Sequence, residues 1–168
     1  MRRRRGWSGD RQRRRRYGAP AGRVLTTAAL VASLSTASAC VPASPSPATY
    51  EDKAATTLGS AVSEVSTVQL TLRQLDRGAT FRPTTLTVLR SSEDSLDTAT
   101  TAFTELNPPP VDDRLHARTT RVLGDAQDLL ARARIAVVRD RPQEYPSLLD
   151  DLDRLHRRLD TFEKQVGS

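Results

Sequence analysis

Cys40 is the residue whose chemistry the sequence specifies best, because it is the only cysteine among the 168 residues. A single thiol rules out an intramolecular disulfide. The three residues before it, Ala37, Ser38 and Ala39, have small side chains, as the residues before a signal-peptidase cut usually do. The pattern predicts cleavage next to Cys40, which would place its thiol at the new N-terminus.

Ala37-Ser38-Ala39-Cys40 resembles the lipobox of bacterial lipoproteins. In that family the thiol takes a diacylglycerol and the processed chain begins at the cysteine, so the resemblance implies lipidation of Cys40. The third position before the cysteine is usually Leu, and here it is Ala37. Ala-Ser-Ala also fits the A-x-A cleavage site of a secreted protein without a lipid, which is the alternative.

The tetrapeptide Asp-Arg-Leu-His occurs twice, at Asp113–His116 and at Asp153–His156, and is a candidate for metal chemistry. A carboxylate and a histidine three residues apart share one face of a helix, and similar Glu-x-x-His pairs bind metals in helical bundles. Counted from an expected turn near Arg141, the two histidines lie roughly 15 Å apart along a bundle at 1.5 Å per residue. We therefore predict no metal site and no cofactor.

Motifs for nucleophilic or phosphate chemistry, such as G-x-S-x-G or a Gly-rich phosphate loop, do not occur in the sequence. No free thiol remains once Cys40 carries a lipid. The sequence therefore predicts no catalytic residue and favours a binding or structural module. A metal-binding or enzymatic bundle is the alternative.

Residues 1–39 have the order of a signal peptide, in which a basic segment precedes an apolar segment and small residues. They carry ten arginines and one acid, and the apolar stretch Val24–Ala39 has 16 residues. A membrane-spanning helix needs about 20. Arg15-Arg16-Tyr17 leaves both twin-arginine and general secretory export open, because Gly18-Ala19-Pro20 stands where a hydrophobic pair should follow.

Net charge differs between the two parts of the chain. Residues 40–168 carry 16 basic and 19 acidic residues, a net charge of −3. The positive excess of the whole chain therefore belongs to residues 1–39, and we predict no nucleic-acid partner for the exported part.

Residues 40–49 contain the run VPASPSPAT, which predicts a semi-extended linker. From Tyr50 onward, apolar residues recur at helical spacing between Pro and Gly breaks. The expected helices span residues 50–77, 83–106 and 110–139, and a fourth runs from Pro142 or Pro146 to about 166. Short connections between such helices predict an all-α, up-down-up-down four-helix bundle over residues 50–168. The fourth helix has the most regular apolar face: Tyr145, Leu148, Leu152, Leu155, Leu159, Phe162 and Val166.

Acidic residues stand four positions before basic ones on the polar faces of the last two helices. This spacing predicts ion pairs within single helices, on faces exposed to water. The pairs are Asp128–Arg132, Asp150–Arg154, Asp153–Arg157 and Asp160–Lys164.

Cys40, the VPASPSPAT linker, the YEDKAA opening and four short-looped helices together resemble the small lipoproteins of actinobacteria, a group without an assigned activity. The resemblance covers the whole chain through layout and composition. It implies a lipid-anchored location on the outer face of the cell membrane, and it carries over no functional residue.

Two surfaces are expected to make contacts. Arg114, Arg118 and Arg121 share one face near the start of the third helix, at the anchored end, where anionic lipid head groups would offset their charge. At the opposite end two loops bring together aromatic and Arg side chains, which are enriched at interfaces, and an envelope protein is the expected partner. The alternatives are an ordinary solvated face for the arginines and closure of the core by the aromatic residues. The residues of the second surface are Phe81, Arg82, Arg139, Arg141 and Tyr145.

Overall fold

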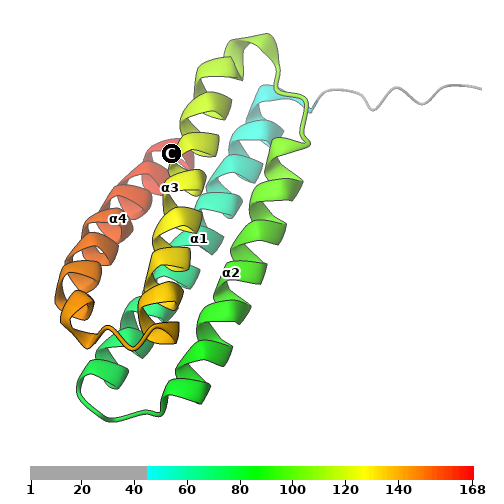
Figure 1. Ribbon diagram of the computed structural model, residues 1–168. Coiled ribbons are helices and arrows are strands. Elements are labelled where there is room, and N and C mark those ends of the chain that lie inside the picture. The colour runs from blue at the N-terminus through cyan, green and yellow to red at the C-terminus, as the bar shows by residue number, and fades with distance from the viewer. Residues whose placement is uncertain (1–44) are drawn as a thin grey trace, which may run out of the picture. The chain divides into compact units, whose positions relative to one another are not determined.

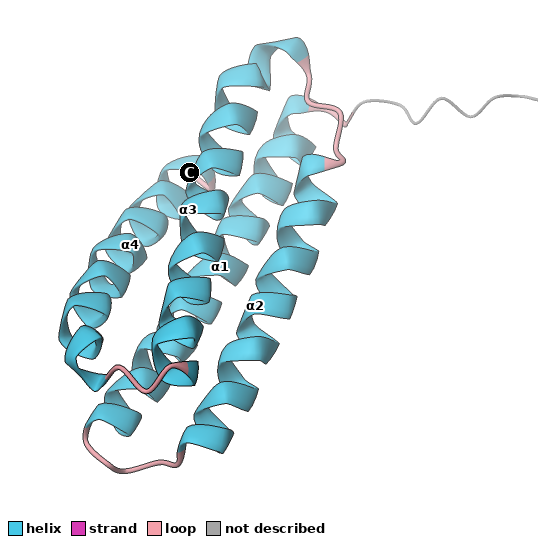
Figure 2. Cartoon of the chain, viewed as in Figure 1, coloured by secondary structure: helices cyan, strands magenta, loops and turns pink. Residues whose placement is uncertain are grey.

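The computed structural model describes residues 45–168, which form four α-helices joined by short loops (Figures 1 and 2). Successive helices run in opposite directions, so the predicted all-α, up-down-up-down bundle is confirmed (Figure 1). Short 3-10 helices, Pro110–Asp112 and Pro142–Glu144, precede the third and fourth α-helices. The α-helices are α1 (Pro47–Asp76), α2 (Arg82–Thr104), α3 (Asp113–Val138) and α4 (Tyr145–Val166).

α1 begins three residues earlier than the apolar pattern predicted. Ser46 is its N-cap residue, and the Ser46 side chain accepts a hydrogen bond from the Thr49 backbone N–H at 3.3 Å. Pro47 occupies the first helical position, where its missing N–H leaves no hydrogen bond unmade. Capping chemistry therefore sets this boundary, and residues 47–49 are helical although they were expected in the linker.

α1 and α3 end in the same hydrogen-bonded turn, although only one of them uses glycine. After α1, Gly78 has φ +68°, and the Ala79 N–H donates to the Gln74 carbonyl at 2.8 Å. After α3, Asp140 takes the equivalent position with φ +55°, and the Arg141 N–H donates to the Ala136 carbonyl at 2.9 Å. The left-handed conformation is easy for glycine and strained for Asp140, which needs support from its neighbours.

The core is a single cluster to which all four helices contribute. Six of the seven residues expected on the inner face of α4 are buried, and the seventh, Val166, packs half-buried against the cluster. The core runs from Tyr50 to Phe162, so the described residues contain a complete core of their own. The unit to which they belong begins at Cys40, and it can be studied without the first 39 residues.

Candidate functional site

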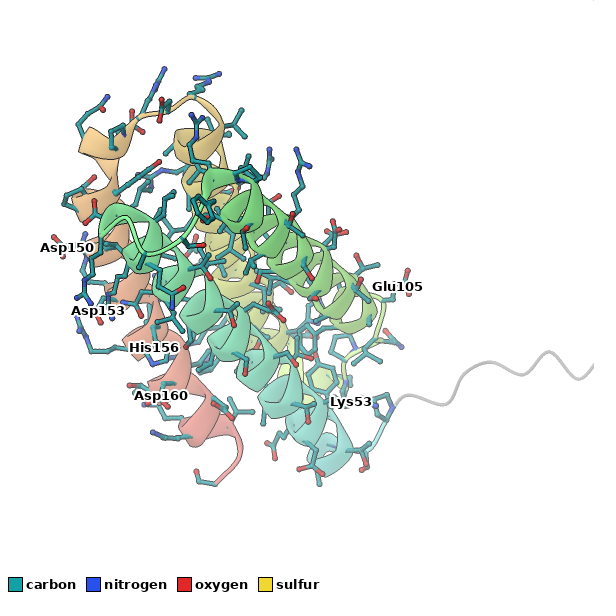
Figure 3. All side chains as sticks on the ribbon, turned by 90° about the horizontal axis from the view of Figure 1, so that it is seen from below. Lys53, Glu105, Asp150, Asp153, His156 and Asp160 are labelled. Carbon is teal, nitrogen blue, oxygen red and sulfur yellow. The ribbon has the colours of Figure 1, made fainter. Side chains whose placement is uncertain are left out.

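The two surfaces expected to make contacts lie at opposite ends of the bundle (Figure 1). α1 and α3 begin at one end, which we call the tether end because the chain enters the bundle there. Lys53 and Glu105, labelled in Figure 3, lie toward this end. The α1–α2 and α3–α4 loops form the opposite end, which we call the distal tip. The predicted cleavage and lipidation site at Cys40 lies outside the described residues.

Arg82 holds the distal tip together. Its Nη2 donates to the carbonyl oxygens of Val137 at 2.8 Å and Val138 at 3.1 Å. Its Nη1 lies 3.2 Å from Oδ2 of Asp140, the residue with the left-handed backbone. These carbonyls belong to the last turn of α3, where they lack partners within the helix. Arg82 therefore caps α3, supports the strained turn and ties the two loops to each other.

Tyr145 and Arg141 also serve the fold. Tyr145 is 3% exposed, and it closes the core at the start of α4. Burial raises the pKa of Tyr145; nearby Arg82 lowers it, and Asp140 and Asp76 raise it further. Nη1 of Arg141 donates to Oε1 of Glu144 at 3.0 Å.

Phe81 is the residue of the distal tip that most clearly faces outward, since it is 80% exposed. It directly precedes Arg82, whose side chain reaches the carbonyl of Val138 at the end of α3, and Val138 itself is 47% exposed. Arg139 follows Val138 and is exposed. We call Phe81, Val138 and Arg139 the tip cluster. Val138 was missed at the sequence level, although its position off the apolar face of α3 was a usable signal.

Arg118 at the tether end is held by α4. Its Cζ lies 3.9 Å from the centroid of the Phe162 ring, and its Nη2 donates to Oε1 of Gln165 at 3.5 Å. Both contacts lie in the last turns of α4, where the helix dipole favours positive charge. The end of α4 therefore offsets part of the positive charge of Arg118, which was expected to be offset by anionic lipid head groups.

Arg114 and Arg121 are exposed, and together with Arg118 they have no carboxylate within ion-pair distance among residues 45–168. Arg114 and Arg118 border a hollow of about 410 Å³ where the starts of α1 and α3 meet the end of α4. We call it the tether-end hollow. Its lining residues are Glu51, Asp112, Arg114, Leu115, Arg118, Phe162, Gln165, Val166 and Ser168.

The histidine of the first Asp-Arg-Leu-His copy packs inside an aromatic cluster. Nδ1 of His116 lies 2.6 Å from the phenol oxygen of Tyr50, and the His116 ring stacks on Phe103 with centroids 5.5 Å apart. Tyr50 is fully buried, and this burial raises the pKa of Tyr50 to about 12, with Asp112 and Asp113 adding to the shift. The phenol stays protonated at neutral pH, so its O–H can donate a hydrogen bond to Nδ1 of His116.

The histidine of the second copy packs elsewhere on α1. Nδ1 of His156 lies 3.1 Å from Oγ of Ser66, which donates to the Val62 carbonyl. Figure 3 shows His156 along α4 between Asp153 and Asp160. The two hydroxyl partners, Tyr50 and Ser66, are 16 positions apart on α1, which is about 24 Å at 1.5 Å per residue. Residues 45–168 contain no group of three or more His, Cys, Asp or Glu side chains placed to hold a metal ion.

Ion pairs cross the seam between α3 and α4, which the sequence analysis did not anticipate. Arg132 and Arg154 both bind Asp151, the former at 3.4 Å, instead of the acids four positions before them. Arg158 of α4 binds Asp125 of α3. The predicted pairs Asp153–Arg157 and Asp160–Lys164 are confirmed. Asp151 attracts both arginines because it faces α3 and its side chain is only 29% exposed.

Comparison of the chain with family models, with curated proteins and with solved structures finds no match. None of the helices in residues 45–168 combines the length and apolar character that crossing a bilayer requires.

Proposed function

We propose that this chain is an exported lipoprotein whose helical bundle is a binding module at the outer face of the cell membrane. Lipid on Cys40 anchors it, and the tip cluster contacts an envelope protein. The observation that carries the anchor is Ala37-Ser38-Ala39-Cys40 at the end of a 16-residue apolar stretch. The observation that carries the contact is the 80% exposure of Phe81.

The tether in this proposal is short. α1 begins at Pro47, so six residues, 41–46, separate Cys40 from the bundle. A Pro-rich segment extends about 3 Å per residue, which gives a reach of about 20 Å. The diacylglycerol carries two acyl chains, and two chains are enough for stable anchoring. The tether end would therefore stay close to the bilayer, and the distal tip would point away from it.

The tip cluster meets two requirements of an interface hot spot. Aromatic and Arg side chains are enriched at such sites, and Phe81 and Arg139 are both exposed at the distal tip. Arg82 fixes the backbone next to Phe81 through two carbonyl bonds and an ion pair. A ring held on a rigid loop loses little conformational freedom on binding, which favours affinity.

The anchor is tested with a labelled fatty acid in cells that process lipoproteins. Label should enter the wild-type chain, and Cys40→Ser should abolish it and shift the protein to the medium. The double change Cys40→Ser with Ser44→Cys should not restore the label, because the moved thiol no longer follows the cleavage site. A wild-type chain found unlabelled in the medium would establish the secreted alternative. An uncut chain that stays in the membrane would refute the signal peptide itself.

The contact is tested by capture from detergent-solubilised envelope membranes. Phe81→Ala should reduce partner capture by about tenfold, a loss of about 1.4 kcal/mol of binding free energy. Its melting temperature should stay near that of the wild type, because the ring is exposed. Leu70→Ala is the matched control, since Leu70 is 58% exposed on α1 outside the tip cluster. Equal capture by both variants would rule the tip cluster out.

A further inference from the structure

The tether-end hollow has the size and position of a small-molecule site. Its volume of about 410 Å³ lies in the range of 300–1,000 Å³ that is usual for ligand pockets. Three helices border it, and two of its lining residues, Arg114 and Phe162, are 48 positions apart in the chain.

The cationic wall is formed by Arg114 and Arg118. Further along the same α3–α4 seam, Arg132 and Arg158 each bind a carboxylate, whereas these two have none within ion-pair distance among residues 45–168. Stacking on Phe162 fixes the guanidinium of Arg118 while its edge N–H groups stay free of strong partners. A fixed guanidinium edge suits the paired oxygens of a phosphate.

The acidic wall includes Asp112, which has a buried carboxylate oxygen without a hydrogen-bond partner among the described residues. Asp112 is 7% exposed, and the oxygen without a partner is Oδ2. Leaving a buried carboxylate oxygen unpaired is costly. Oδ2 has almost no accessible surface, but Asp112 lines the hollow, so a rotation of its side chain toward the hollow would let a ligand supply the missing donor. Glu51, at the start of α1, adds a second carboxylate to the same hollow.

The hollow thus combines two guanidinium groups, two carboxylates and an apolar surface made by Leu115, Phe162 and Val166. We propose that it binds the phosphate–amine head group of a zwitterionic phospholipid with a primary amine, such as phosphatidylethanolamine. The phosphate contacts Arg114 and Arg118, the ammonium donates to Asp112, and the short carbon chain lies on the apolar surface. The membrane as the source of this ligand rests on the proposed anchor, whereas the head-group chemistry does not.

The decisive measurement compares vesicles that differ only in the head group. Residues 41–168 without lipid are sedimented with vesicles of phosphatidylcholine alone, or of phosphatidylcholine with either phosphatidylethanolamine or phosphatidylglycerol. Choline is a quaternary amine and cannot donate a hydrogen bond to Asp112, while the glycerol head group has no amine. Binding should be about tenfold tighter to the ethanolamine vesicles than to phosphatidylcholine alone, the effect of one charge-assisted hydrogen bond. Soluble phosphoethanolamine should compete.

Three variants separate the site from general attraction of positive charge. Arg114→Gln with Arg118→Gln should weaken ethanolamine-vesicle binding by about tenfold or more. Asp112→Asn should bring ethanolamine and choline vesicles to equal affinity, and its melting temperature should hold or rise because it removes an unpaired buried charge. Arg132→Gln with Arg158→Gln is the matched control on the same seam, and it should leave binding unchanged.

Tighter binding to glycerol vesicles than to ethanolamine vesicles, unaffected by Asp112→Asn, would overturn the proposal in favour of a basic patch. Absence of binding to all vesicles and to phosphoethanolamine would overturn it outright. Binding of phosphoethanolamine without any vesicle binding would overturn the lipid source. Because the protein in this test carries no lipid, none of these outcomes depends on whether Cys40 is the anchor.

Discussion

α4 contacts α1 along one side and α3 along the other, and the two seams are built differently. On the α1 side, Leu152 and Leu159 flank the bond between His156 and Ser66, and both leucines are fully buried. On the α3 side, Leu155 and Leu129 remain 7% and 6% exposed, and they border a groove of about 570 Å³.

Side-chain size explains the difference. α1 presents small residues to α4 and its C-terminal end, among them Ala55, Gly59 and Ser66, so α4 can approach closely. A Cβ added at Gly59 would lie 2.9 Å from Oε1 of Glu163 on α4. α3 instead presents long charged residues whose partners lie across the groove, as in Arg132–Asp151. Small residues let two helices pack closely and exclude water, whereas ion pairs along a seam leave a polar groove between the helices. At the tether end of the α3–α4 seam lies the hollow, whose arginines have no carboxylate partner within residues 45–168.

The largest expected effect comes from truncating leucines on the two seams of α4. Leu152→Ala, on the closed seam with α1, should reduce the free energy of unfolding by about 3–5 kcal/mol. Leu155→Ala, beside the groove, should cost about 2 kcal/mol, because water can enter the space that it leaves. Urea denaturation of residues 41–168 measures both. An equal or larger cost for Leu155→Ala would contradict the comparison.

High pH should destabilise the bundle through the aromatic cluster of Tyr50, Phe103 and His116, away from both seams of α4. Tyr50 of α1 has an ordinary pKa of 10.0 when unfolded and about 12 when folded. The unfolded chain therefore releases this proton first, and stability falls as the pH rises from 10 toward 12, being fully present below 10. Denaturation of wild type and Tyr50→Phe across this interval gives the test. The variant should lose less stability than the wild type, and parallel losses would show that Tyr50 is not responsible.

The ion pairs beside the groove should contribute little. Asp151→Asn removes the carboxylate shared by Arg132 and Arg154, and it should cost about 0.5–1 kcal/mol, less at high salt. Asp150→Asn is the matched control, since the neighbouring Asp150 is exposed and forms no ion pair within residues 45–168 (Figure 3). The comparison would fail if the two variants were equally destabilised, or if salt left the difference unchanged.

The smallest effects come from two glycines. Gly124→Ala on α3 should raise stability by up to about 1 kcal/mol, because alanine is the better helix former and the new Cβ would meet no atom beyond the adjoining backbone of its own helix. Gly59→Ala should gain less, because the Glu163 side chain must move away. Thermal melts of the two variants suffice, and an equal gain at both sites would show that α1 and α4 are less closely packed than described.

Much of this fold follows from local pattern. A period of 3.6 residues identified the inner faces, as the buried positions of α4 from Tyr145 to Phe162 confirm. Pro and Gly located the turns to within a few residues. The start of α1 at Pro47 was missed because the apolar pattern ignores capping, although Ser46 followed by Pro47 was a readable signal.

The candidate sites were less predictable, because partners across helices depend on how the helices are rotated and offset. Arg82 and Tyr145 were placed at the distal tip from the loops alone, and closure of the core by Tyr145 was the alternative that its place on the apolar face offered. The capping of α3 by Arg82 could not be predicted, because it depends on where the end of α3 lies in space. The tether-end hollow was not anticipated at all, since Asp112 looked like an ordinary residue at the start of a helix.

The sequence by itself determined the four helices, their inner faces and their order, because backbone hydrogen bonding and apolar burial repeat over a few residues. The tertiary structure decided which charged side chains find partners. Arg132, Arg154 and Arg118 each have long side chains that can reach several groups. The packing of α4 against α3 brings Asp151 to Arg132 and Phe162 to Arg118, and Arg154 then shares Asp151 from one turn further along its own helix.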